Sequence, residues 1–342
     1  MKDKAKPQIK TEFINLQTDF GFKHVFGSLK HKHLLIRFLN ALFKDVLTVR
    51  DVTYHDKEIL PSEEKGKRIV YDVYCTSKFK RNENLLFPKN QISSDNGKGE
   101  IDYHFILEMQ NIYTPPFEER MTYYVFQMVS QQGKIGWDYT LEPVFGIAVI
   151  DFNLGKLEPK LIRNVMLTDT DSGEHLTEKV QMIFCSLPQL PKKWEDCKTE
   201  IEQMLFLIKN IETMNTNSKP YTEGNYSELF DAARSSELRE DEVVYYSQSL
   251  EKLRDTQRGI EYAAKEAARV AAAEAAKKAE KKGMAKGLAK GLAEGRAEGR
   301  AEGRADALRD VVKFLLSQNS DLEFISHATG LSIDEIRKLQ ND

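Results

Sequence analysis

The chain has 342 residues, and the hydrophobic share of 41% is enough to fill a core of substantial size. Charged residues make up 30% of the chain, but the formal net charge is only -3, so no molecule-wide positive field attracts nucleic acid. The cysteines are too few and too scattered for a disulfide framework or a zinc site, and no apolar run is long enough for a signal core or a membrane span. We therefore expect a cytoplasmic protein with no membrane partner.

The first third of the chain predicts helices followed by two strands. Large apolar residues recur at helical spacing between residues 20 and 43, which predicts two short helices or one helix interrupted near Gly27. Residues rich in β-branched and aromatic side chains then predict a strand from Ile69 to Thr76, and DYHFILEMQ predicts a second strand at residues 102–110. The polar stretch between them, residues 81–100, is much longer than a hairpin loop and is interpreted as an insertion.

The middle of the chain predicts the rest of an α/β domain. Residues 117–132 place their apolar side chains on one helical face, and PVFGIAVIDF is a continuous apolar run typical of a strand buried on both sides. This order of elements predicts a mixed central sheet flanked by helices, in a first domain of residues 1–217. Two further strands and another amphipathic helix are predicted near residues 161–169, 180–190 and 201–214.

Residues 218–305 are expected to form a low-complexity linker or stalk. From about Asp241 to Asp310 the composition is dominated by Ala, Glu, Lys and Arg, which predicts a segment that is either a long helix or disordered. Because four residues advance about 40° beyond a full helical turn, a four-residue glycine repeat in this segment would form a slowly winding row. The row is interpreted equally well as part of a solvated linker or as a stalk that joins copies of the chain into a homo-oligomer. Its members are Gly283, Gly287, Gly291, Gly295, Gly299 and Gly303.

The last segment, residues 306–342, predicts a small helical unit. Gly330 is expected to end one helix, and Ser332 with Glu335 forms the capping-box pattern that begins the next. The sequence ISHATGLSIDEI resembles a helix-turn-helix, which would contact DNA. Acidic residues stand beside the basic ones in its final helix, however, and this favours a protein-interaction or capping bundle.

Two carboxylates and an amide stand out in the predicted strands. Period-two alternation along residues 102–110 puts Glu108 and Gln110 side by side on one face. Asp72 lies within an otherwise apolar run, where an unpaired charge would be costly. Two such carboxylates on neighbouring strands repel each other unless a cation lies between them, and oxygen-only ligation suits Mg²⁺ or Mn²⁺. The pattern therefore predicts a divalent-metal centre.

Six segments carry a resemblance to known proteins: DFGFKHVFG, YDVYCTSK, FILEMQ, ERMTYYVFQM, GKIGWDYTLEPVFGIAVIDF and LPQLPKKWEDCKTEIEQMLFLIKN. Together, over residues 16–210, they resemble the PD-(D/E)XK nuclease superfamily, and within it the Rpn family of recombination-promoting nucleases and transposases. The resemblance implies a restriction-endonuclease-like core in which Asp72 is the motif aspartate, Glu108 is the acidic residue of the (D/E)XK motif and Gln110 stands where that motif has lysine. It also implies that Asp19 is a further acidic residue that assists the metal site.

The activity implied by the resemblance is that of a Mg²⁺- or Mn²⁺-dependent DNA endonuclease with weak sequence preference, linked to recombination or transposition of mobile DNA. Gln110 departs from the superfamily pattern because an amide cannot take up a proton as a neutral lysine can. Activation of the attacking water would then depend on the metal, while Gln110 would orient that water. The insertion at residues 81–100 is a second departure, and it leaves the pairing of the strands that carry Asp72 and Glu108 open.

Three further residues are candidate contacts to DNA. Arg120 is placed on the helix after Gln110, and its guanidinium matches phosphate geometry. Tyr123 could share that helix face, and Lys23 could contact the DNA backbone. Two of them have an alternative role, since Arg120 could pair with a neighbouring glutamate and Tyr123 could belong to the core. Asp19, the further acidic residue, could instead cap the first helix.

Other functions fit parts of the same pattern. Asp72 and Glu108 could form a structural ion pair or lie exposed at strand ends, in which case the chain would be a catalytically inactive scaffold that assembles through its helical tail. A transposase that joins DNA strands is a third possibility. We rank it low, because the sequence offers no clear third acid for a carboxylate triad.

Overall fold

The computed structural model describes residues 9–56, 58–59, 69–80, 100–155 and 157–341. The chain forms two compact units, Met1–Gly259 and Ile260–Asp342. Each unit has a hydrophobic core of its own, and each is described below by itself. Among the described residues, no helix combines the length and the apolar character needed to cross a lipid bilayer.

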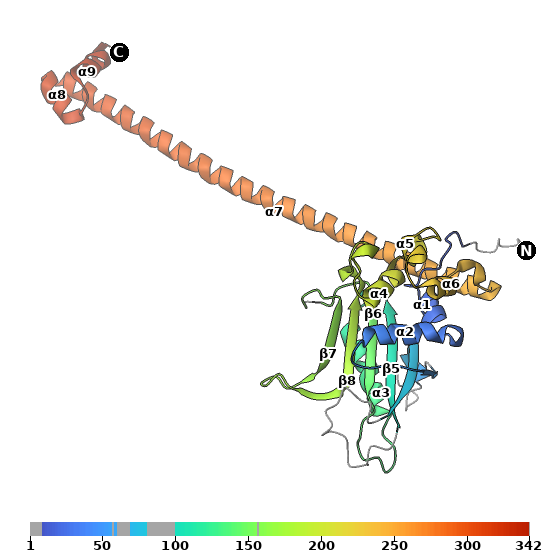
Figure 1. Ribbon diagram of the computed structural model, residues 1–342. Helices are drawn as coiled ribbons and strands as arrows, with labels where there is room; N and C mark the ends of the chain where they lie inside the picture. Colours follow the sequence, from blue (N-terminus) through green and yellow to red (C-terminus); the bar gives the residue numbers. More distant parts are fainter. Residues whose placement is uncertain (1–8, 57, 60–68, 81–99, 156, 342) are drawn as a thin grey trace, which may run out of the picture. The chain divides into compact units, whose positions relative to one another are not determined.

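A mixed sheet of six strands forms the centre of the first unit (Figure 1). Its strands are β1 Thr53–Tyr54, β4 Val73–Lys80, β5 Glu100–Gln110, β6 Val144–Ile150, β7 Ile162–Thr168 and β8 His175–Ser186, and a separate small sheet pairs β2 Glu58–Ile59 with β3 Ile69–Val70. The spatial order is β1-β4-β5-β6-β8-β7. Strands β5, β6 and β8 run parallel, whereas β4 is antiparallel to β5 and β7 is antiparallel to β8.

Helices cover both faces of this sheet. One face packs against α1 Asp19–Phe26, α2 Lys32–Leu42 and α4 Glu200–Asn210, and the other packs against α3 Phe117–Ser130. Two short helices, α5 Lys219–Thr222 and α6 Ser227–Ala232, precede the long helix α7 Glu240–Ser317. This is the restriction-endonuclease-like α/β arrangement that the sequence predicts.

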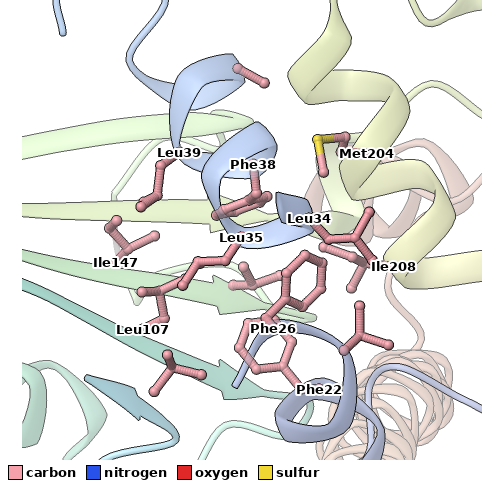
Figure 2. Packing of buried hydrophobic residues seen from close by; sticks show 14 of the residues in the cluster. Phe22, Phe26, Leu34, Leu35, Phe38, Leu39, Leu107, Ile147, Met204 and Ile208 are labelled. Carbon is pink, nitrogen blue, oxygen red and sulfur yellow. The ribbon is translucent and has the colours of Figure 1, made fainter. Parts of the chain in front are cut away.

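The larger core lies between the sheet and the helices α1, α2 and α4. Figure 2 shows Phe26, Phe38 and Met204 from these helices packed against Leu107 of β5 and Ile147 of β6. Each of these side chains is almost fully buried, and burial of one such side chain is worth roughly 1.5–3 kcal/mol. The core therefore packs the first helix against the sheet whose strand β5 carries Glu108 and Gln110.

The second core lies between the sheet and α3. All seven residues of β6 are buried, which confirms the strand expected from the continuous apolar run. The buried face of α3 consists of Phe117, Met121, Val125 and Met128, as the helical spacing predicts. Gly146 of β6 lets this helix approach closely, since a Cβ at that position would lie 2.4 Å from Val125 Cγ2 and 2.8 Å from Met121 Cε.

The prediction of one continuous strand from Ile69 to Thr76 is wrong, because two separate strands, β3 and β4, occupy this part of the chain. The chain breaks between β3 and β4 at Tyr71 and Asp72. Tyr71 turns its buried ring toward α3 and donates its hydroxyl to the Tyr124 carbonyl at 3.2 Å. The Asp72 side chain bonds to the backbone of β5, and this side-chain bond competes with regular strand pairing. β3 pairs with β2 instead of joining the main sheet.

The first unit extends beyond the boundary expected near Asn217. Phe230 and Tyr246 are fully buried in the same core as the first helices. The N-terminal segment joins this region through backbone bonds from Ile14 N to Ala233 O and from Ser235 N to Glu12 O, at 2.8 and 2.9 Å. Residues near both ends of the unit are therefore needed to complete one core.

The second unit contains the remainder of α7 together with α8 Leu322–Thr329 and α9 Ile333–Asn341. Of the two states expected for the repeat segment, the structure has the helix, and the six glycines lie within it. Val312, Ile325 and Ile336 form a small core near the C-terminus. Gly330 ends α8 in a left-handed conformation with φ of 74°, and reciprocal bonds between Ser332 and Glu335 confirm the capping box.

Candidate active site

Asp72 lies at the point where the chain enters the main sheet. Its Oδ2 accepts a hydrogen bond from the backbone N–H of Met109 at 2.9 Å, and this bond ties the carboxyl group to β5. The side chain is buried, and burial raises the pKa of the Asp72 carboxyl above its ordinary value, although the nearby Lys23 ammonium offsets part of the rise. The fold therefore holds this carboxyl group rigidly in surroundings that disfavour its charge.

Glu108, near the end of β5, is the neighbour of Asp72, which directly precedes β4. Its Oε1 accepts a hydrogen bond from the Asp72 backbone N–H at 3.3 Å, so the two acidic residues are linked directly. Burial, followed by the repulsion of the Asp72 carboxylate, raises the pKa of Glu108 well above its ordinary value. Glu108 forms no ion pair with any residue in the described ranges, and its charge is therefore poorly compensated within the chain.

Lys23 projects from α1 onto this acidic pair. Its Nζ lies 3.1 Å from Asp72 Oδ1 and 2.5 Å from Asp19 Oδ1, so that one ammonium group bridges two carboxylates. Burial acts to lower the pKa of Lys23, but Asp72 and Asp19 outweigh it and the pKa lies above its ordinary value. The Lys23–Asp72 contact corresponds to the ion-pair alternative for Asp72, although it leaves Glu108 outside the pair.

The first-helix cap is Thr18 and not Asp19. The Thr18 side chain accepts the backbone N–H of Gly21 at 3.0 Å, while Asp19 occupies the first helical position with a largely exposed carboxylate. An acidic residue in the first turn also interacts favourably with the helix dipole. Asp19 thus remains available near the acidic pair, as a partner of Lys23.

Gln110 and Arg120 form a hydrogen-bonded pair between β5 and α3. Gln110 Oε1 accepts from Arg120 Nη2 at 2.7 Å, and Gln110 Nε2 donates to the carbonyl of Ile112 at 2.7 Å. Arg120 also donates to Thr114 Oγ1 at 3.3 Å. The guanidinium of Arg120 therefore fixes the orientation of the Gln110 amide. It makes no ion pair with a glutamate among the described residues.

Asp72, Glu108 and Gln110 meet at one cleft of about 380 Å³. Asp19 and Arg120 line the same cleft, so it contains five of the seven residues that the sequence singles out. Its remaining lining comes from the segment before α1, from the chain after β5 and from the beginning of α7: Gln17, Thr18, Met109, Asn111, Ile112, Thr114, Ser249, Lys252, Leu253 and Thr256.

The α7 residues that line the cleft were not predicted from the sequence. Ser249, Lys252 and Thr256 stand more than 130 residues after Gln110, in the segment expected to be a linker or stalk, and no local signal ties them to the acidic pair. Tyr123 is the opposite case, since it is predicted as a DNA contact but lies outside the cleft lining with an exposed fraction of 47%.

The donor chemistry of the cleft fits a hard divalent cation. Asp72 and Glu108 offer carboxylate oxygens whose charge is disfavoured by burial, and a cation would relieve that cost. Among the described residues, no group of three or more His, Cys, Asp or Glu side chains is arranged to hold a metal ion. Further ligands would therefore come from amide or carbonyl oxygens, water or substrate, as is usual for Mg²⁺.

Comparison with protein-family models supports the resemblance found in the sequence. A model described as PD-(D/E)XK nuclease family transposase matches residues 16–85 and 96–263. This match continues through the first turns of α7, beyond the residues from which the resemblance was inferred, and it includes every residue that lines the cleft. Comparison with curated proteins and with solved structures gives no match for the chain.

Proposed function

The chain belongs to the PD-(D/E)XK nuclease family transposases, and from this premise we propose that it is a metal-dependent DNA endonuclease that hydrolyses phosphodiester bonds. The proposal includes weak sequence preference and a role in the recombination or transposition of mobile DNA. The main support is the pair of carboxylates formed by buried Asp72 and partly buried Glu108, which are linked to each other at the edge of a cleft. We further propose that it acts in the cytoplasm, which is consistent with three cysteines that are all unpaired.

In this proposal, the acidic residues of the cleft, Gln110 and Arg120 have separate roles. Asp72 and Glu108 would hold Mg²⁺ or Mn²⁺ through carboxylate oxygens, with Asp19 as an additional acidic group. The bound ion would lower the pKa of a water molecule and neutralise charge on phosphate oxygens. Gln110 cannot take up a proton, so it would orient water by hydrogen bonding. Arg120 would keep that amide in place.

The test is the nicking of supercoiled plasmid in Mg²⁺ and, separately, in Mn²⁺. We expect activity in the wild type and a loss of about 10²-fold or more in Asp72→Asn and in Glu108→Gln, because each variant removes a charged ligand. Asp171→Asn is the matched control, since Asp171 is exposed on the turn between β7 and β8 and lies outside the cleft lining. A wild type that nicks under neither ion, or an Asp72→Asn variant as active as the control, would contradict the proposal.

Self-association through α7 is a separate part of the proposal. The helix exposes Met284, Leu288 and Leu292 next to the glycine row, with exposed fractions of 75%, 76% and 56%. Large apolar side chains spaced four residues apart form a row along one side of a helix, and such a row is a surface that a second helix can cover. A second copy of the chain would supply that helix.

A further inference from the structure

The beginning of α7 forms one wall of the candidate active site. Ser249, Lys252, Leu253 and Thr256 have the spacing of a single helical face, and all four line the cleft that contains Asp72 and Glu108. This part of α7 belongs to the first unit, which ends at Gly259. The wall therefore consists of residues that could not be predicted from Asp72, Glu108 or the strands next to them.

Hydrogen bonds fix this wall to the rest of the first unit. Ser249 Oγ accepts the backbone N–H of Phe20 at 3.2 Å, and Gln257 Nε2 donates to Asn111 Oδ1 at 3.2 Å. One turn earlier, the Tyr246 hydroxyl accepts the backbone N–H of Asn15 at 2.9 Å. These bonds reach both the segment before α1 and the chain after β5, so α7 has a defined position at the cleft.

The positively charged groups near the cleft differ in how far they are already engaged. Lys23 is bound to Asp19 and Asp72, and Arg120 is bound to Gln110 and Thr114. Lys252 also lines the cleft, but its side chain is exposed and its ammonium forms no ion pair within the described part of the chain. It is thus the cleft cation that can bind an incoming anion without losing a partner.

A DNA strand must bring its phosphates close to the carboxylates of this cleft, and the mutual repulsion opposes its entry. We propose that Lys252 contacts a backbone phosphate of the bound DNA and that α7 thereby helps to hold the strand against Asp72 and Glu108. This inference rests on the proposed function, because it takes DNA as the substrate. A lysine contact of this kind contributes to affinity for every sequence alike.

The experiment measures binding of the full chain to a fluorescently labelled DNA duplex at several salt concentrations. Ca²⁺ replaces Mg²⁺, and a gel confirms that the duplex stays intact. Each phosphate contact contributes about 0.9 to the slope of log affinity against log salt. We expect Lys252→Gln to reduce the slope by about one contact and to weaken binding several-fold at low salt, and we expect Lys252→Arg to restore both values. Lys265→Gln is the control, because it removes the same charge from an exposed position farther along α7.

The outcomes separate this inference from the nuclease proposal. If the wild type nicks plasmid but Lys252→Gln has the salt slope and affinity of Lys265→Gln, the Lys252 contact is wrong and the nuclease proposal stands. If the wild type nicks under no ion tested but its salt slope depends on Lys252, the contact stands and the nuclease proposal fails. A wild type that does not bind the duplex overturns both.

Discussion

The carboxyl groups of buried Asp72 and partly buried Glu108 lie next to each other, and the fold alone compensates their charges incompletely. Burial raises the pKa of both groups, and the mutual repulsion adds to the shift at Glu108. A carboxyl group with a raised pKa in the folded state holds its proton more tightly than it does in the unfolded chain. Its contribution to the free energy of unfolding is therefore present at low pH and is lost as the pH rises.

Replacing Glu108 with glutamine tests this imbalance in the absence of metal. Glu108→Gln keeps an oxygen that can accept the Asp72 N–H but removes the carboxylate charge beside Asp72. We expect the variant and the wild type to have similar melting temperatures below about pH 4, the ordinary range of a glutamate pKa, and we expect the variant to become more stable as the pH rises above it. A gain of about 1 kcal/mol would raise the melting temperature by ~2–4 °C.

Thermal unfolding in EDTA between acid and neutral pH provides the measurement. Asp171→Asn again serves as the control, because it removes one carboxylate from an exposed turn outside the cleft lining. A Glu108→Gln variant that is less stable than the wild type at neutral pH would show that the chain itself needs the Glu108 charge. That result would weaken the case for a metal ligand at this position.

The sequence located part of the candidate site at residue level. Strand alternation brings Glu108 and Gln110 onto one face, and the apolar surroundings of Asp72 mark it as unusual, so these three residues could be expected at one place. The bridge formed by Lys23 and the hydrogen bond between Arg120 and Gln110 could not be expected, because both depend on the packing of helices against the sheet. Sequence spacing does not fix such contacts between elements.

At the scale of elements, Gly146 sets the distance between α3 and the sheet. A Cβ added at Gly146 would meet Val125 Cγ2 at 2.4 Å, closer than real contacts allow, so the Val125 side chain or the helix that carries it would have to shift. We expect Gly146→Ala to lower the free energy of unfolding by about 1–3 kcal/mol, the usual cost of overpacking a core. Because α3 carries Arg120, plasmid nicking should decrease as well.

Denaturant unfolding followed by circular dichroism measures the stability change. Gly133→Ala is the matched control, since a Cβ there would lie no closer than 3.6 Å to its neighbours. Equal unfolding midpoints for the two variants would mean that α3 tolerates displacement. The expectation that a displaced α3 moves Arg120 and decreases plasmid nicking would then be wrong.

The sequence predicted most elements of the first unit and failed where side chains interrupt them. The buried strand β6 and the helices α3 and α4 follow from apolar patterns, and their bounds differ from expectation by a few residues. The break at Asp72 has no such pattern, because residues 69–76 are as β-prone as a continuous strand. There a side chain-to-backbone hydrogen bond prevails over strand propensity.

At the scale of the whole molecule, α7 combines six glycines with an exposed apolar row. Each glycine costs a helix about 1 kcal/mol relative to alanine, so contact with another helix would add needed stability. We expect the wild type to self-associate at micromolar concentration and the triple variant Met284→Gln, Leu288→Gln, Leu292→Gln to have the mass of a single chain. Light scattering coupled to size-exclusion chromatography measures both.

The control for this variant changes the opposite side of the same helical segment. Residues two positions apart lie about 200° apart around a helix, so Lys282→Gln, Lys286→Gln and Lys290→Gln together leave the apolar row intact. This control should keep the mass of the wild type. If the wild type already has the mass of one chain, or if both triple variants dissociate alike, the apolar row is not the surface of association.

The joining of residues 12–15 to residues 233–246 bears on how the protein is made. Until Tyr246 and the following turns of α7 have left the ribosome, the nascent chain lacks both a partner for its first residues and one wall of the cleft. Under the proposed function, the cleft that would cleave DNA therefore stays incomplete through most of the chain's synthesis. A chain released by a premature stop before α7 would also lack this wall and, under the proposed function, would not cleave DNA.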